Sequence, residues 1–238
     1  MRDALASPAG NPYAEGLARV VAGETFDDAG DVALPAGAEA RAIIEDAIAT
    51  LAGGGRPFLA LGGDHSITYP ILRGLVPSQP SLTILQIDAH PDLYDEFEGD
   101  RYSHACPFAR IMEERLCAWL VQVGIRAMTA HQRDQARRFG VEQIDMRAWT
   151  AGARPQIAGP WYLSLDLDGL DPAFAPGVSH REPGGLSVRD VLALLESIDA
   201  PLIGADIVEL NPSQDVSAMT ARVAAKLVKE LLGRWLSR

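Results

Sequence analysis

The segment 82–92 combines an apolar run with side chains that can bind a metal ion. Residues 82–87 are mainly apolar, and Asp88, His90 and Asp92 follow at alternate positions. In extended backbone, side chains two residues apart point to the same face, so these three groups share one side where the strand ends. Buried carboxylates repel one another and lose hydration unless a cation lies among them. The spacing indicates a divalent metal site; the alternative is a polar turn with an incidental histidine.

Two other segments have the same character. An apolar run that begins at Trp161 ends in Asp166 and Asp168, which again share a face. The run 58–61 leads through a glycine turn to His65. Each segment alone has an ordinary explanation, such as a helix-capping aspartate or a hydrogen-bonded core histidine. Three such strand ends in one chain favour a shared site.

The remaining pattern predicts the elements that position these groups. Apolar residues recur at spacings of three and four over 36–51, which predicts an amphipathic helix. Strands are expected at 57–61, 82–88, 118–123, 141–144, 161–167 and 202–208, and helices at 66–75, 103–115, 129–138, 187–196 and from Val216. This alternation predicts an α/β fold with a mainly parallel sheet covered on both faces. In such folds ligands bind at the carboxyl ends of the strands, where all the candidate residues fall.

Length and composition limit the class of protein. The 238 residues suit a single domain, 1–238, although the first 35 or so have little pattern beyond a possible short helix at 14–21. The net charge of −11 argues against a nucleic-acid partner. We expect no signal peptide and no membrane span. Two cysteines, Cys106 and Cys117, fit a reducing, cytoplasmic location.

Three motifs carry a resemblance to a known family. Residues 62–66 (GGDHS), 88–92 (DAHPD) and 164–168 (SLDLD) resemble the metal motifs of the ureohydrolases, which include arginase and agmatinase. Residues 88–112, 170–186 and 204–212 look most similar to plant-type arginases and their bacterial agmatinase-like relatives. The resemblance implies a three-layer α/β/α fold with a centre of two Mn²⁺ ions.

The resemblance also assigns six metal ligands. It places His65, Asp88, Asp92 and Asp166 on one ion, and Asp88, His90, Asp166 and Asp168 on the other. Four aspartates would neutralise two divalent cations, and hard oxygen and imidazole ligands suit Mn²⁺, although Ni, Co, Fe or Zn could compete. Two such ions can lower the pKa of a shared water so that hydroxide attacks the substrate. Asp92 is counted among the catalytic residues as well as among the metal ligands.

Residues outside the metal motifs acquire roles from the same resemblance. Glu209 matches the family carboxylate that binds the guanidinium group, and His104 matches a histidine that transfers protons near the metals. Without the resemblance, both are typical of ordinary surface positions. Asp64 and Asp206 are expected to orient the ligands, and the sequence leaves open whether His180 faces the site.

The predicted activity is hydrolysis of a small cationic guanidino compound to urea and an amine. The substrate is L-arginine or agmatine, giving ornithine or putrescine. Plant-type resemblance favours arginine, whereas the acidic loop 95–100 could bind the free amine of agmatine. Arg101 and Arg181 are the only nearby candidates to bind the arginine carboxylate. Guanidinobutyrate, guanidinopropionate and formiminoglutamate are alternative substrates.

Two further expectations come from the family. Its members form trimers or hexamers, which implies a homo-oligomer. They also usually begin with an additional strand that the sequence lacks before residue 57, so a catalytically impaired relative that binds a metabolite is an alternative.

Overall fold

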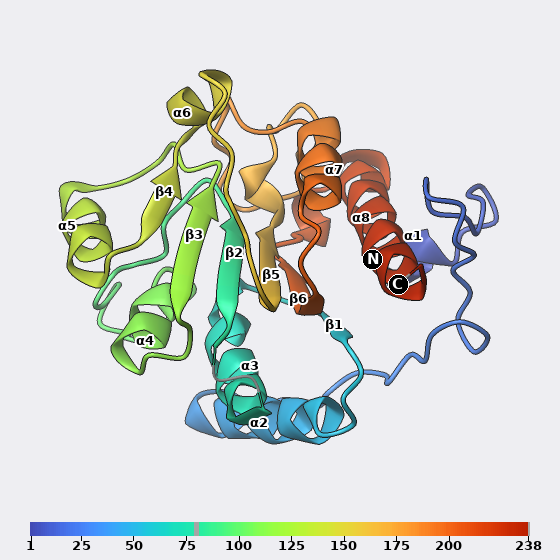
Figure 1. Ribbon diagram of the computed structural model, residues 1–238, viewed down its shortest axis with the longest axis horizontal. Helices are drawn as coiled ribbons and strands as arrows, with labels where there is room; N and C mark the ends of the chain where they lie inside the picture. The colour runs from blue at the N-terminus through green and yellow to red at the C-terminus, as the bar shows by residue number, and fades with distance from the viewer. Residues whose placement is uncertain (79–80, 238) are drawn as a thin grey trace.

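The computed structural model describes residues 1–78 and 81–237, and a parallel sheet lies at its centre (Figure 1). Its six strands run in the order β1-β6-β5-β2-β3-β4, and every neighbouring pair is parallel. The strands are β1 (Phe58–Leu61), β2 (Thr83–Ile87), β3 (Trp119–Val123), β4 (Glu142–Ile144), β5 (Trp161–Asp166) and β6 (Leu202–Val208). The predicted α/β fold is confirmed.

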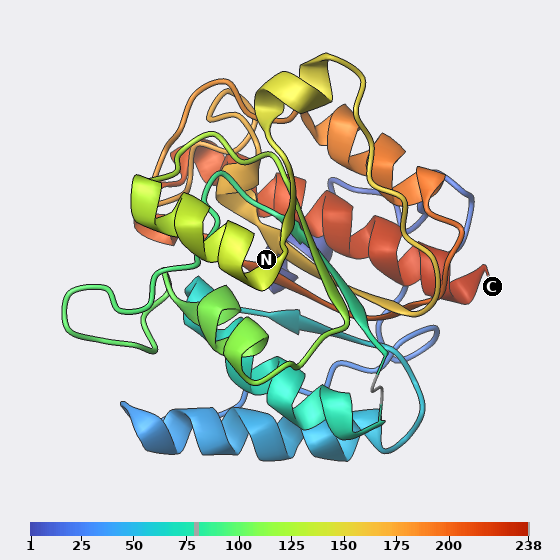
Figure 2. The same cartoon turned by 60° about the vertical axis from the view of Figure 1, so that its left-hand side comes forward.

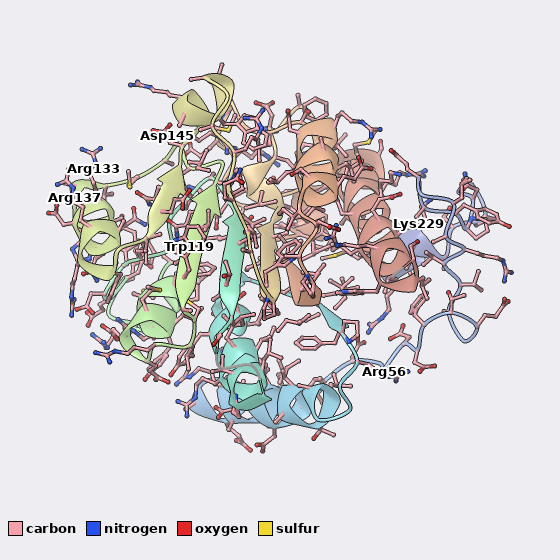
Figure 3. The ribbon with its side chains drawn as sticks, in the orientation of Figure 1. Arg56, Trp119, Arg133, Arg137, Asp145 and Lys229 are labelled. Carbon is pink, nitrogen blue, oxygen red and sulfur yellow. The ribbon has the colours of Figure 1, made fainter. Side chains whose placement is uncertain are left out.

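Helices cover both faces of the sheet (Figures 1 and 2). The first layer contains α2 (Ala38–Ala52), α3 (Thr68–Leu75), α4 (Pro107–Glu113) and α5 (Ala130–Phe139), and the second contains α6 (Met146–Thr150), α7 (Val188–Ser197) and α8 (Met219–Leu236). The exposed side chains of Arg133 and Arg137 on α5 point away from the sheet (Figure 3). The chain thus has the three layers that the alternating pattern predicts.

The strand β2 shows why its sequence is mainly apolar. Ile84 packs into the cluster beneath α2, α3 and α4, whereas Leu85 and Ile87 pack into the cluster beneath α7 and α8. All three side chains are fully buried. A strand that is covered on both faces needs apolar residues at successive positions, because neither side meets water. This burial fixes the strand end from which the site residues project.

Local signals explain both ends of α5. Thr129 and Gln132 form a reciprocal capping box at the start of α5, and Gly140 ends the helix in a left-handed conformation. The helix expected at 66–75 is α3, which begins at Thr68 after a short 3-10 helix, His65–Ile67. Asp64 caps this 3-10 helix by accepting a hydrogen bond from the Ser66 amide.

The N-terminal segment differs from the prediction. Residues 14–21 form no helix; instead an isolated bridge joins Tyr13 to Arg19, and the preceding short helix is α1 (Arg2–Leu5). Ala14 packs against α8 so closely that a Cβ at Gly233 would lie 2.5 Å from the Ala14 Cβ. The buried alanine reflects contact with α8 rather than a helical period. Among residues 1–78 and 81–237, no helix combines the length and apolar character needed to cross a membrane.

Candidate metal centre

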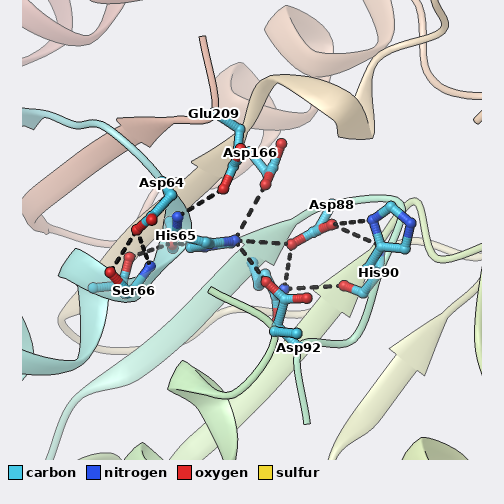
Figure 4. A network of polar contacts seen from close by, with 12 residues as sticks. Asp64, His65, Ser66, Asp88, His90, Asp92, Asp166 and Glu209 are labelled. Carbon is cyan, nitrogen blue, oxygen red and sulfur yellow. Dashed lines mark hydrogen bonds and ion pairs between the residues drawn. The ribbon is translucent and has the colours of Figure 1, made fainter. Parts of the chain in front are cut away.

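Four adjacent strands bring the predicted site residues together at their carboxyl ends. His65 follows β1, Asp88 follows β2, Asp166 ends β5 and Glu209 follows β6. Since β1, β6, β5 and β2 are consecutive in the sheet, residues up to 144 positions apart in sequence become neighbours. Figure 4 shows these side chains converging on His65.

His65 lies at the centre of three carboxylates. Its Nδ1 atom is 3.1 Å from Asp88 Oδ2, 3.0 Å from Asp92 Oδ2 and 3.3 Å from Asp166 Oδ2. Potential ligand atoms of His65, Asp88 and Asp92 all lie within 4.8 Å of one another. This spacing is suited to a single cation that all three groups contact.

Asp88 also belongs to a second group of potential ligands. Asp88, His90 and Asp168 each offer one atom within 4.8 Å of the others, and His90 Nδ1 is 3.0 Å from Asp168 Oδ2. Asp166 belongs to neither of these two compact groups, but its Oδ1 accepts a hydrogen bond from the Asp168 amide at 2.7 Å. The structure therefore places all six predicted residues in one region, with Asp88 common to both groups.

The close approach of the backbone explains the glycine after Asp168. A Cβ atom on Gly169 would lie 2.8 Å from the Asp88 amide nitrogen and 3.1 Å from its Cα. Any larger residue would push the two ligand-bearing segments apart. Gly62 has a similar role after β1, because a Cβ there would meet the Ile67 side chain at 2.3 Å.

A hydrogen bond between His65 Nε2 and Ser164 indicates which ring nitrogen carries the proton. Ser164 Oγ donates to Asp206 Oδ1 at 2.8 Å, so it can only accept from His65 Nε2, which is 2.9 Å away. Tyr162 and Thr68 also donate to Asp206. In a neutral imidazole with its proton on Nε2, the Nδ1 lone pair points at the carboxylates.

This arrangement fits a metal ion. His65 Nδ1 is buried and has no hydrogen-bond partner among the described residues, although three carboxylate oxygens lie within 3.3 Å. A buried ring nitrogen surrounded by anionic oxygens needs a positive charge beside it, which a bound metal ion would supply. The donor set, with imidazole and carboxylate and no thiolate, suits hard or borderline divalent cations.

The pKa shifts of the buried groups reflect the same need for positive charge. Burial, together with the charges of Asp168 and Asp88, raises the pKa of Asp166 well above its usual value. Burial and the charge of Asp88 raise the pKa of Asp92 to about 7. Although burial opposes it, hydrogen bonding to Asp168 and Asp88 raises the pKa of His90 to about 11. The cluster therefore binds protons strongly, and a divalent cation would take their place.

Glu209 lies next to the metal-binding region, whereas His104 lies at its mouth. The Glu209 carboxylate accepts a hydrogen bond from the His65 amide at 2.9 Å, and burial raises its pKa. Its backbone has a φ of 66°, which is unusual for a non-glycine residue and concentrates at functional sites. The His104 ring stacks on His180 with centroids 5.5 Å apart, and His180 in turn lies 6.1 Å from the His90 ring. His180 thus faces the site.

A cavity of about 510 Å³ adjoins His104. One of its lining side chains, Arg41, is positively charged and was not predicted from the sequence. Arg41, from α2, lines this cavity and lies 4.0 Å above the ring of Tyr102. The two predicted cations are engaged elsewhere: Arg101 pairs with Asp95 and Glu113, and Arg181 donates to Pro176 and Gln214. Arg41 carries no local sequence signal, because only the packing of α2 brings it here.

Comparison with known proteins agrees with the fold and the motifs. The chain belongs to the arginase family, whose profile matches residues 1–233. It is 53% identical over 186 residues to the mitochondrial arginase 1 of Arabidopsis thaliana, a match that covers 74% of this chain and 54% of that protein. It is 32% identical over 232 residues to an agmatinase of Bacillus anthracis, covering 94% of this chain and 80% of the relative.

A solved structure supports the same assignment. The arginase from Medicago truncatula superposes with a TM-score of 0.89 and 37% identity, covering 98% of this chain and 79% of the other. The chain spans about half the length of the curated plant arginases that it matches. The predicted family is therefore confirmed.

Proposed function

We propose that this protein is a metal-dependent hydrolase that releases urea from L-arginine. The observation that carries the proposal is the position of His65 Nδ1, a buried ring nitrogen within 3.3 Å of three carboxylate oxygens. We assign one metal ion to His65, Asp88, Asp92 and Asp166, and a second to Asp88, His90, Asp166 and Asp168. Mn²⁺ is the ion we favour for these ligands. When bound, such ions supply a water of lowered pKa as the nucleophile.

The residues around this centre have distinct tasks. Glu209 binds the planar guanidinium through paired, charge-assisted hydrogen bonds and orients its carbon toward the metals. Its hydrogen bond from the His65 amide fixes the carboxylate beside the ligand set. His104 moves a proton to the departing amine, because an imidazole offers both a donor and an acceptor nitrogen. Stacking on His180 positions this ring at the mouth.

Arg41 supports arginine as the substrate, because it provides a cation for the substrate carboxylate in the cavity next to His104. Agmatine is the second candidate, because Asp64, Glu98 and Asp100 line the same cavity and could bind a free amine. The names of the relatives include both activities, arginase for the plant proteins and agmatinase for the bacterial one.

Urea release tests this proposal directly. Protein incubated with Mn²⁺ is assayed with L-arginine and with agmatine in parallel. Urea from arginine, with ornithine in equal amount, is the expected result. Urea from agmatine alone would show that the substrate is agmatine and not arginine, while the proposed hydrolysis of a guanidino group would stand. Absence of urea from both, in protein that has bound metal, would contradict the proposal.

The location and assembly of the protein belong to the same proposal. Cys106 and Cys117 are free thiols, which is consistent with a reducing, cytosolic environment. We also propose a trimer or hexamer. Sedimentation of the purified protein checks this point, and a mass of one chain would contradict it.

A further inference from the structure

Three glutamines form a continuous chain of amides that ends on Asp88. Gln86, Gln122 and Gln143 occupy paired positions on the neighbouring strands β2, β3 and β4. Gln143 donates to Gln122 Oε1 at 2.7 Å, Gln122 donates to Gln86 Oε1 at 2.6 Å, and Gln86 donates to Asp88 Oδ2 at 2.7 Å. Gln86 and Gln122 are completely buried, and Gln143 is half-buried.

The direction of the chain follows from chemistry. An ionised carboxylate only accepts hydrogen bonds, so Gln86 must present its NH₂ group to Asp88 and its oxygen to Gln122. That requirement forces Gln122 to present its own NH₂ group to Gln86, and Gln143 to do the same to Gln122. All three amides therefore point their donors toward the metal-binding region.

The same amides also bind the loop that carries the proposed ligands. The second donor of Gln86 reaches the His90 carbonyl at 3.1 Å, and that of Gln122 reaches the Pro91 carbonyl at 2.7 Å. Four hydrogen bonds thus connect two buried glutamines to one another, to the Asp88 carboxylate and to the backbone at residues 90 and 91. The loop 88–92, which these bonds hold, contains the proposed ligands Asp88, His90 and Asp92.

We propose that the glutamine chain, defined as Gln86, Gln122 and Gln143, positions the shared ligand Asp88 and its loop for metal binding. The inference rests on the proposed metal centre. One lone pair of Asp88 Oδ2 is occupied by Gln86, which leaves the other directed toward His65, 3.1 Å away. Holding the carboxylate in this rotation before the metal arrives removes an ordering cost from binding, as hydrogen-bond partners of metal ligands commonly do.

Polar side chains in the middle of a buried sheet are otherwise unfavourable. An amide buried without partners destabilises a protein, and apolar residues could fill these three positions. The glutamine chain is instead hydrogen-bonded without a break from β4 to Asp88. Its function is therefore best sought at the end where it contacts Asp88. These glutamines are positioning residues and need not contact the substrate.

The test compares Gln86→Met with Gln135→Met in the full-length protein. Methionine is similar in size to glutamine but lacks the donor. Gln135 is a buried glutamine on α5 that does not belong to the glutamine chain, and it serves as the matched control. Mn²⁺ binding is measured by calorimetry, and the stability of each metal-free protein is measured by urea denaturation with a chelator present.

The expected result is that Gln86→Met raises the Mn²⁺ dissociation constant about ten- to a hundredfold, while Gln135→Met leaves it unchanged. Gln122→Met is expected to have a smaller effect in the same direction, because it removes the support of Gln86 but not its contact with Asp88. A purely structural role would lower the stability of the metal-free protein without changing the affinity of the folded fraction for Mn²⁺.

Two outcomes would overturn the inference. The first is wild-type Mn²⁺ affinity in folded Gln86→Met, or in folded Gln122→Met if the first variant does not fold. The second is an equal loss of affinity in Gln135→Met. Failure of the proposed function looks different, because the wild-type protein itself would then bind no Mn²⁺ or would bind it and release no urea.

Discussion

His65 Nε2 lies 2.9 Å from Ser164 Oγ, and the serine hydroxyl donates to Asp206. This contact links a proposed metal ligand that follows β1, through a serine on β5, to a buried carboxylate on the neighbouring strand β6. It fixes the ring so that Nδ1 faces Asp88, Asp92 and Asp166. The orientation of the ligand is therefore built into the sheet and does not depend on the metal.

Removing this support is expected to weaken metal binding. Ser164→Ala leaves His65 Nε2 without its acceptor, so the ring loses its fixed tautomer, and the Mn²⁺ dissociation constant should rise about ten- to a hundredfold. Calorimetric titration of the metal-free protein measures the change. Ser197→Ala is the control, since its hydroxyl donates to the Leu194 carbonyl within α7, away from the proposed metal centre. Equal Mn²⁺ affinity in Ser164→Ala and the wild type would show that this hydrogen bond does not orient the ligand.

Asp166 tests whether the proposed ligand set is correct. Its Oδ2 atom lies 3.3 Å from His65 Nδ1, but the two compact groups of ligand atoms form without it. If Asp166 bridges both ions, Asp166→Ala should bind fewer than two Mn²⁺ per chain and lose nearly all urea release. Metal content after gel filtration provides the count. Asp134→Ala, at an exposed position on α5, is the control. Two tightly bound ions in Asp166→Ala would exclude a bridging role.

Glu209 offers a separate test of substrate binding. Glu209→Gln retains an oxygen that can accept from the His65 amide but loses the charge that pairs with a guanidinium. A charge-assisted hydrogen bond contributes about 1.5–3 kcal/mol, so KM is expected to rise about ten- to a hundredfold. The affinity for Mn²⁺ should stay the same. Steady-state kinetics and metal titration measure the two effects, and Glu182→Gln, in the loop after β5, is the control. A loss of metal binding instead would reassign Glu209 to the metal centre.

Much of the fold follows from hydrophobic runs in the sequence. The run 82–87 predicts a doubly covered strand, and Ile84 and Leu85 indeed pack into opposite layers. The end of the helix expected at 36–51 was predictable because Gly53 follows it, and α2 ends at Ala52. The segment 14–21 was not, because its buried Ala14 and Val20 owe their burial to packing against distant parts of the chain rather than to a local period.

The site was predictable only where chemistry is concentrated in short motifs. His65, Asp88 and Asp166 stand out because charged groups follow apolar strands, and the structure places them together; their role as ligands stays a prediction. Arg41 carries no such signal, since only the packing of α2 brings it beside His104. Gln86 did carry one, as an uncharged polar residue inside an apolar run, but its partner on β3 emerges only from the strand register.

Asp171 provides the last prediction, because it shapes the loop that carries His180. Its carboxylate accepts hydrogen bonds from the amides of Ala173, Gly184 and Gly185, at 2.9, 2.6 and 3.1 Å. The bond from Ala173, with those from the two glycines, lowers the pKa of Asp171 although burial opposes the shift. Asp171→Ala should therefore reduce the free energy of unfolding at pH 7 by about 1–2 kcal/mol.

The pH dependence of that loss follows from the direction of the shift. A carboxyl group whose pKa is lower in the folded state stabilises the protein at pH values above its unfolded pKa of about 3.9, and this contribution disappears as the pH falls through the folded value. The difference in unfolding free energy between wild type and Asp171→Ala should thus be largest near neutral pH and shrink as the pH falls below about 4. Urea denaturation of the metal-free proteins from pH 7 to pH 3 measures it, with Asp134→Ala as the control. A difference that is independent of pH would mean that the alanine variant perturbs packing rather than removing a charged acceptor.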